Sequence, residues 1–271
     1  MNNLISYKIK NVLSDLAKET FPDIKHNSFN FKLDNRQLKT KHGDWSYPRK
    51  DKKSEIRIFN LSRNTKEIIK TSIHELAHNS EYSIYKETGH SKRFYKVYKD
   101  LLEKAIQMGL LNYEDIRTVW DITKLVKHHG EIKAKFDPSK AYKRDVSIVK
   151  IYNAYIVKET LKERGYKYSP IEQTWSLEIN KEVLNDEVNY LSKFIDTENI
   201  ITSDVRDLEI EALGYVIVDK CYKYKDTLKG NGYRFKGYNQ KGNVWVKKIK
   251  LSNLEKEELL LKPINIILKE N

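Results

Sequence analysis

Residues 74–78 read His-Glu-Leu-Ala-His, and Gly89-His90 follows a short distance along the chain. Two histidines four positions apart on a helix project from one face, where their imidazole nitrogens can hold one metal ion. A glutamate between them is placed to take a proton from water at that metal, as in metal-assisted peptide hydrolysis. The pattern therefore predicts Zn²⁺ bound by His74 and His78, with Glu75 as the catalytic general base.

The residues around this motif predict an amphipathic helix. Asn64-Thr65 can cap its start, and Glu67 places negative charge in its first turn. Apolar residues then recur at helical spacing, at Ile68, Ile69, Ile73, Leu76, Ala77 and Ile84. The alternative is that the two histidines are ordinary polar residues on the surface of this helix.

His90 is the predicted third ligand, since a catalytic zinc site has three protein ligands and one open position. Gly89 can turn the chain back at the end of the first helix, and Ser91 can cap a second one. The apolar stripe of that second helix is Phe94, Val97, Tyr98, Leu101, Leu102, Ala105 and Ile106. The rival third ligand is a carboxylate of the second helix, Asp100 or Glu103.

Other polar residues near the motif are interpreted as solvated. Glu81 and Glu87 are expected to be exposed helix charges. Four histidines lack a partner at ligand spacing and are expected on the surface: His26, His42, His128 and His129.

A longer pattern runs from Ile56-Arg57-Ile58-Phe59 through residues 74–78 to Gly89-His90-Ser91-Lys92-Arg93-Phe94. It resembles the SprT-like, or Spartan-type, zinc metallopeptidase family over about residues 25–110. Members have a short strand, a helix bearing the two histidines, a Gly-His turn, and an aromatic residue four positions after the third histidine. The resemblance implies zinc at His74, His78 and His90 with Glu75 as general base. The best-known members cleave proteins crosslinked to DNA.

The chain departs from the family pattern in two places. Ser91 stands where many members have a second glycine, which is a minor change because serine caps a helix well. The cysteine-rich zinc ribbon that often follows the domain is excluded, because Cys221 is the only cysteine. Recruitment of a substrate must therefore depend on a different structure.

Composition limits the class of protein. A chain of 271 residues can bury a core and is expected to divide into two or three units. A single cysteine fits a reducing compartment. The N-terminal segment has too many charges for a signal peptide, and no apolar run approaches the roughly 20 residues that span a bilayer. We expect a soluble cytoplasmic protein with no membrane partner.

The predicted fold class is α+β, with a zincin-like domain over residues 1–125. Residues 29–61 alternate apolar and polar in the manner of strands and predict a small antiparallel sheet packed on the zinc helix. Glu55–Phe59 is expected as an edge strand, which could pair with an extended substrate. Residues 112–125 predict a third helix, capped by Asn112, that buries Ile116, Val119, Trp120 and Ile122. A basic linker follows over residues 126–145.

An internal repeat occupies the second half of the chain. Residues 146–200 and 211–271 each predict the order β-α-β-β-α, with a glycine ending the first helix. Leu161, Gly165, Tyr166, Tyr168 and Trp175 match Leu228, Gly232, Tyr233, Phe235 and Trp245. The order loosely resembles small modules that accompany DNA-processing enzymes.

Charge separates the two repeats. The chain has a net charge of +13, with the excess of lysine and arginine in residues 1–150 and 211–250 and an acidic excess in residues 151–210. The second repeat is therefore the candidate for binding nucleic acid, DNA or RNA, through Tyr233, Arg234, Lys236, Tyr238, Lys241, Trp245, Lys247, Lys248 and Lys250. Two alternatives stay open. The lysines can reflect a lysine-rich composition, and the aromatic rings, Trp175 and Trp245 above all, can belong to the hydrophobic core of each hairpin.

These features predict a zinc-dependent endopeptidase that acts on DNA-associated proteins and is recruited by its basic C-terminal module. One alternative is a non-catalytic DNA-binding or anti-defence protein of a mobile element, in which the zinc is structural. Another is a peptidase for one regulatory protein, with the repeats as a docking surface. Cys221 is expected to be a buried thiol. The oligomeric state is not predicted.

Overall fold

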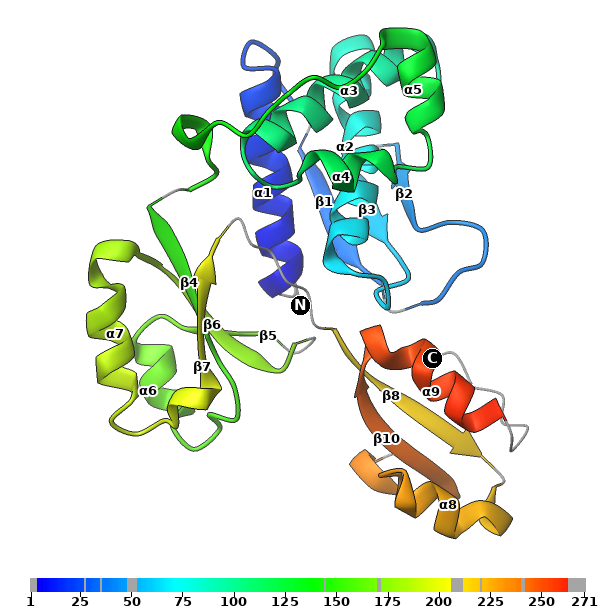
Figure 1. The fold of residues 1–271 in the computed structure, drawn as a ribbon, viewed down its shortest axis with the longest axis vertical. Coiled ribbons are helices and arrows are strands. Elements are labelled where there is room, and N and C mark those ends of the chain that lie inside the picture. Colours follow the sequence, from blue (N-terminus) through cyan, green and yellow to red (C-terminus); the bar gives the residue numbers. More distant parts are fainter. Residues whose placement is uncertain are drawn as a thin grey trace.

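The computed structural model describes residues 4–26, 28–34, 36–47, 53–143, 145–169, 172–205, 212–219, 221–239 and 242–262. Within these ranges the chain is α+β, as predicted, with three separate small sheets. Figure 1 shows the first sheet beside α1 and α2, and the other two sheets in separate units formed by the second half of the chain.

The N-terminal part consists of α1 (Leu4–Thr20), β1 (Phe29–Leu33), β2 (Gly43–Ser46), β3 (Ser54–Ile58), α2 (Thr65–Tyr85) and α3 (Lys92–Gln107). Its sheet has the strand order β1-β3-β2. The buried faces of α1, α2 and α3 pack with one face of this sheet into a common hydrophobic core. The predicted N-terminal amphipathic helix corresponds to α1, whose Ile9, Leu13 and Leu16 are fully buried.

The prediction of an antiparallel sheet is wrong, because β1 pairs in parallel with β3 and only β2 pairs antiparallel with it. The prediction that Glu55–Phe59 is an edge strand is also wrong. β3 lies between β1 and β2, so both of its edges are occupied. Its alternating pattern arises because Ser54, Ile56 and Ile58 are buried while the intervening residues are only half-buried. Among the described strands, β1 and β2 lie at the two edges of this sheet.

The single helix predicted over residues 112–125 is two short helices, α4 (Tyr113–Arg117) and α5 (Ile122–His129). Asn112 caps the first helix as expected, through reciprocal hydrogen bonds with Asp115. Trp120 lies in the turn between the helices and is 72% exposed, which contradicts its predicted burial. Because the helix breaks before residue 120, the helical periodicity that predicted burial does not apply there.

The first C-terminal unit contains β4 (Val146–Ile151), α6 (Lys158–Glu163), β5 (Lys167–Ser169), β6 (Thr174–Asn180), α7 (Leu184–Leu191) and β7 (Ile200–Asp204), with the strand order β5-β6-β4-β7. The second contains β8 (Leu213–Asp219), α8 (Lys225–Gly230), β9 (Arg234–Phe235), β10 (Val244–Lys250) and α9 (Leu254–Leu261), with the order β8-β10-β9. Short 3₁₀ helices precede several elements, at Pro138–Lys140, Lys181–Val183, Thr197–Asn199, Tyr222–Tyr224, Gly237–Asn239 and Leu251–Asn253.

Both C-terminal units contain a buried tyrosine–glutamate pair at matching positions. The hydroxyl of Tyr166 donates to Oε1 of Glu187 at 3.0 Å, and the hydroxyl of Tyr233 donates to Oε1 of Glu257 at 2.8 Å. Each glutamate also forms an ion pair, Glu187 with Arg164 and Glu257 with Lys247. Burial of a carboxylate is tolerated here because each is neutralised and hydrogen-bonded. The sequence comparison of the repeats had not identified this pair.

The N-terminal part also contacts the first C-terminal unit. The Nζ atom of Lys8 on α1 donates to Oγ of Ser176 on β6 at 3.1 Å. In the segment that precedes this unit, the hydroxyl of Tyr142 donates to the carboxylate of Asp15, also on α1, at 3.0 Å. The division into domains at residues 125, 145, 200 and 211 stays a prediction. No helix in the described ranges is both long enough and apolar enough to cross a membrane.

Candidate metal centre

Helix α2 places His74 and His78 on one face. It begins where predicted, with the side chain of Asn64 accepting a hydrogen bond from the backbone of Glu67 at 2.9 Å. The helix ends at Tyr85, and the next residue, Lys86, has a left-handed φ of 62°. The sequence had suggested that Gly89 would turn the chain here, but Lys86 takes the left-handed conformation instead. Ser91 then caps α3 as expected, with its hydroxyl accepting from the backbone of Phe94.

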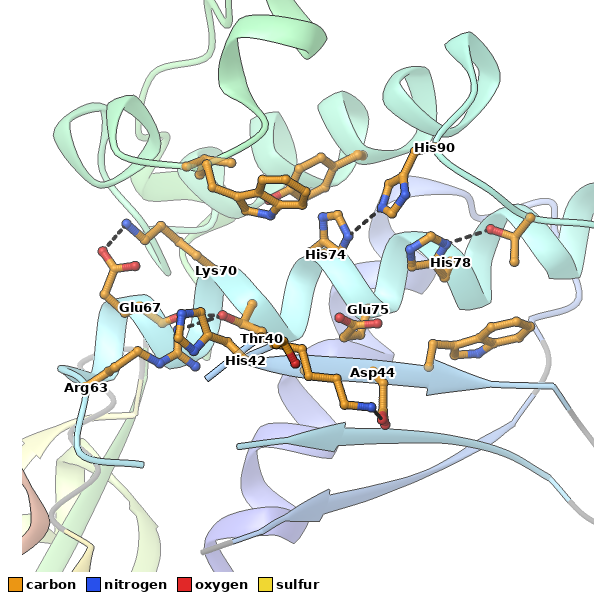
Figure 2. Close-up of a pocket in the computed structure, with 18 of the residues that line it drawn as sticks. Thr40, His42, Asp44, Arg63, Glu67, Lys70, His74, Glu75, His78 and His90 are labelled. Carbon is orange, nitrogen blue, oxygen red and sulfur yellow. Dashed lines mark hydrogen bonds and ion pairs between the residues drawn. The ribbon is translucent and has the colours of Figure 1, made fainter. Parts of the chain in front are cut away.

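The three predicted ligands converge. One nitrogen from each of His74, His78 and His90 lies within 4.8 Å of the others. The Nε2 atoms of His74 and His90 are 3.1 Å apart. Figure 2 shows the two side chains facing each other, joined by a dashed line. The rival ligands lie elsewhere among the described residues, Asp100 in an ion pair with Lys96 and Glu103 in one with Lys99.

The electrostatics of this cluster fit a metal ion. Burial, and then the proximity of His78 and His90, holds the pKa of His74 well below its ordinary value. Burial, and then His90, lowers the pKa of His78 to about 3. Both imidazoles are therefore neutral at physiological pH, which is the form that binds metals. Three imidazole nitrogens facing one point, with no carboxylate among them, form a donor set that can hold a metal ion.

Glu81 holds the turn that contains His90 in place. Contrary to the prediction of a solvated charge, its side chain is completely buried. Its carboxylate accepts hydrogen bonds from the hydroxyl of Thr88 at 2.7 Å, the backbone of Gly89 at 3.2 Å and Nε of Arg93 at 3.0 Å. Glu81 thereby fixes the loop that brings His90 to α2. Glu87, in contrast, is largely exposed, as predicted.

Glu75 lies in the same cleft and is 7% exposed. Burial, and then the neighbouring carboxylate of Asp44, raises its pKa to about 8, against a smaller lowering by Lys41. A cation bound at the histidine cluster would favour the ionised carboxylate. Gly43 is the close neighbour of Glu75 on β2, since a Cβ atom there would lie only 2.9 Å from Oε1 of Glu75. Sequence patterns had not singled out this glycine.

The cleft around these residues has a volume of about 760 Å³. It extends from the histidine cluster along β2 to a charged end formed by His42, Arg63, Glu67 and Lys70, which Figure 2 shows together. His42 is exposed, as predicted, and it also lines this cleft. Its Nδ1 atom lies 2.6 Å from the side-chain amide of Asn60.

The predicted nucleic-acid residues divide into three groups. Tyr233 and Trp245 are each 3% exposed and pack in the core of the second C-terminal unit, so neither can stack on a base in this structure. Lys247 is tied to Glu257, and the Nζ atom of Lys248 donates to Gln173 of the first unit. The exposed members are Arg234, Lys236, Tyr238 and Lys250, and Lys241 lies outside the described residues.

Two exposed aromatic residues that had not been predicted adjoin this group. Tyr215 on β8 lies with its ring centroid 5.1 Å from that of Tyr238, and Phe235 on β9 is also exposed. The guanidinium of Arg234 lies over the ring of Tyr238 at 5.8 Å. We refer to Tyr215, Arg234, Phe235, Lys236 and Tyr238 as the basic aromatic surface.

No protein-family model, curated protein or solved structure matches this chain. The residues of the cleft and the geometry in which they lie therefore carry what can be inferred about its function.

Proposed function

We propose that this chain is a zinc-dependent endopeptidase of the SprT-like type, with a zincin-like domain over residues 1–125. One observation carries the proposal. The nitrogens of His74, His78 and His90 lie within 4.8 Å of one another, and Glu75 lies on the same helix in the same cleft. Three imidazole ligands and a nearby carboxylate are the components of a hydrolytic zinc site.

Zinc in such a site polarises a carbonyl group and acidifies water. Glu75 is the residue placed to take the proton from that water and to pass it to the leaving amine. Its place on the same helix and in the same cleft as the histidine cluster supports this role. Gly43 leaves the space in which the Glu75 side chain lies.

Strand β2 is the candidate for holding an extended substrate. It lies at the edge of its sheet, and residues 43–45 line the cleft. An unpaired strand edge can form backbone hydrogen bonds with a peptide laid beside it. The prediction of an edge strand beside the site is therefore retained in the proposal, but moved from Glu55–Phe59 to Gly43–Ser46.

The rival is a protein in which zinc is only structural. A structural site is closed by four protein ligands. In the described part of the chain, only three residues converge. A zinc ion held by these three residues would keep a position for water, which favours the hydrolytic alternative.

We further propose that the substrates are DNA-associated proteins, approached through the basic aromatic surface. Its positive charges would contact phosphates and its exposed rings would stack on bases. This part of the proposal depends on the exposure of Arg234, Lys236 and Tyr238 and on their mutual proximity.

Metal analysis of the purified protein tests the site. We expect about one zinc ion per chain, and none in His78→Ala, because two remaining ligands hold zinc poorly. His128→Ala is the matched control, since His128 is exposed and outside the cluster. Zinc retained by His78→Ala at the wild-type level would refute the ligand assignment.

A further inference from the structure

The lining of the cleft includes charged and aromatic side chains beside several threonines. The cations of the lining, Lys41, Arg63 and Lys70, already have partners within the chain. Lys70 pairs with Glu67, and Lys41 with Asp44. Arg63 donates to the carbonyl groups of Phe59, Asn60 and Glu67 and to the hydroxyl of Thr71. A negatively charged ligand would have to compete with these contacts, so the cleft has few cations that could bind it.

Aromatic rings line the cleft beside His78. The ring of Trp45 on β2 stacks at 6.4 Å from that of His78, and its Nε1 donates to the side chain of Asn79 at 3.3 Å. Tyr47 lies edge-on to Trp45 at 4.7 Å, and Tyr82 of α2 contacts both rings. Tyr47 is 55% exposed although it belongs to this cluster. The cluster thus presents a fixed apolar surface to the cleft.

Trp120 approaches the same centre from the turn between α4 and α5. Its ring centroid lies 6.0 Å from that of His74 and 6.3 Å from that of His90. Even so, most of the indole is exposed, and it lines the cleft. An exposed tryptophan at the mouth of a cleft leaves a large apolar area in water, which a bound apolar group would cover.

We infer that the cleft selects peptide segments that carry an aromatic side chain next to the cleaved bond, with Trp120 as the main contact and Trp45 and Tyr47 as a second aromatic wall. The inference rests on the proposed function and adds a substrate class to it. A peptide laid along β2 passes the histidine cluster, and its side chains alternate between two sides. The residues that flank the cleaved bond therefore meet the two aromatic walls.

A peptide is favoured over a nucleic acid at this place. Edge strand β2 offers backbone hydrogen bonds that a peptide can use, whereas a phosphate backbone needs cations that are free to contact it. The lysines and the arginine that line the cleft are engaged with partners in the chain.

Two measurements test the inference. In the first, wild type and Trp120→Ala, both loaded with zinc, digest denatured casein, and mass spectrometry maps the cleaved bonds. We expect Phe, Tyr or Trp to be enriched beside those bonds in the wild type. Trp120→Ala should lose that enrichment and cleave aromatic sites about 3- to 10-fold more slowly, as for the loss of one aromatic contact. Tyr155→Ala, which removes an equally exposed ring outside the cleft, should behave as wild type.

The second measurement needs no hydrolysis. Tryptophan fluorescence follows binding of N-acetyl-Gly-Gly-Phe-Gly-Gly-amide, and of the same peptide with Ala in place of Phe, to Glu75→Gln protein. We expect about 3- to 10-fold tighter binding of the Phe peptide, and loss of that difference when Trp120→Ala is added.

The outcomes separate the inference from the proposed function. Cleavage without aromatic enrichment, or enrichment that survives Trp120→Ala, would overturn the inference and leave the peptidase intact. Absence of cleavage, together with binding that depends on the Phe side chain and Trp120, would support the inference and count against the peptidase. A fluorescence change with a thymidine oligonucleotide that depends on Trp120, and none with the peptides, would overturn the inference in favour of a nucleic-acid groove.

Discussion

The hydroxyl group of Thr88 lies 2.9 Å from Nδ1 of His78. The same hydroxyl lies 2.7 Å from the carboxylate of Glu81, which can only accept a hydrogen bond. Thr88 must therefore give its single proton to Glu81 and accept one from Nδ1 of His78. This fixes the tautomer of His78 and leaves Nε2 unprotonated, as a metal ligand requires.

Thr88→Val should weaken metal binding while preserving the shape of the side chain. Loss of such a supporting hydrogen bond typically costs about 10- to 100-fold in metal affinity. Competition for zinc with a chromophoric chelator measures the change. Thr20→Val, which removes a hydroxyl that bonds only the backbone of α1, is the control. Equal zinc affinities in wild type and Thr88→Val would show that the hydroxyl has no such role.

Gly43→Ala should displace Glu75, the proposed general base, without preventing metal binding. The added Cβ atom would meet Cγ2 of Thr71 at 2.8 Å and Oε1 of Glu75 at 2.9 Å, both closer than side chains tolerate. Because a small misplacement of a catalytic group is costly, we expect kcat/KM to fall by about 10-fold or more at unchanged zinc content. Gly89→Ala is the control, since a Cβ atom there has no neighbour within 4 Å. Full activity in Gly43→Ala would mean that Glu75 need not occupy its observed place.

Lys8 should destabilise the protein at neutral pH. Burial, opposed by Glu178 and Glu172, lowers its pKa from 10.5 to about 8. Between these two pH values the unfolded chain binds more protons than the folded one, so this residue makes stability rise with pH. The free-energy cost of burying the charged lysine is therefore paid in full below about pH 8 and disappears as the pH rises towards 10.5.

The free energies of unfolding of wild type and Lys8→Met, measured in urea at several pH values, therefore show how the charged and the neutral lysine differ in their effect on stability. We expect Lys8→Met to be the more stable protein at about pH 7, by about 1–3 kcal/mol, and the gap to narrow as pH rises. Lys18→Met, on the exposed side of the same helix, is the control. A gap that does not change with pH would show that the charge of Lys8 is not penalised.

The basic aromatic surface should bind single-stranded DNA weakly and with strong salt dependence. Each lysine or arginine that contacts a phosphate releases counterions, so affinity falls as salt rises. The double variant Arg234→Glu and Lys236→Glu should lower affinity and flatten the salt dependence, as measured by fluorescence anisotropy with full-length protein. The same charge change at Lys162 and Lys167, exposed residues of the first unit, is the control. Equal losses in both variants would indicate a general effect of net charge.

The sequence predicts local features well because they depend on neighbouring residues. Asn64, Ser91 and Asn112 cap the helices that were assigned to them, and the spacing of His74 and His78 is a property of one helix. Convergence of His90 on the other two was also predicted, from the short turn before it. That turn restricts where the third histidine can lie.

Features that depend on distant partners were missed. Strand β1 pairs in parallel with β3, although β2 lies between them in the sequence. The alternation of apolar and polar residues within a strand does not show whether it pairs parallel or antiparallel. Glu81 is buried because Thr88 and Arg93 reach it from the following turn and helix. Trp120 is exposed because the helix breaks before it. Burial of Trp245 was not missed in the same way, since a place in the hydrophobic core was one of the two alternatives left open for it, and that alternative is confirmed.

Hydrolysis by zinc-loaded wild type and by Glu75→Gln, measured by mass spectrometry of a denatured protein substrate, tests the central claim most directly. Glutamine keeps the shape of the side chain but cannot accept a proton at neutral pH. We predict that the wild type cleaves peptide bonds, and that Glu75→Gln binds zinc equally well but cleaves about 10²- to 10⁴-fold more slowly. Cleavage by Glu75→Gln at the wild-type rate, or no cleavage by zinc-loaded wild type, would contradict the account.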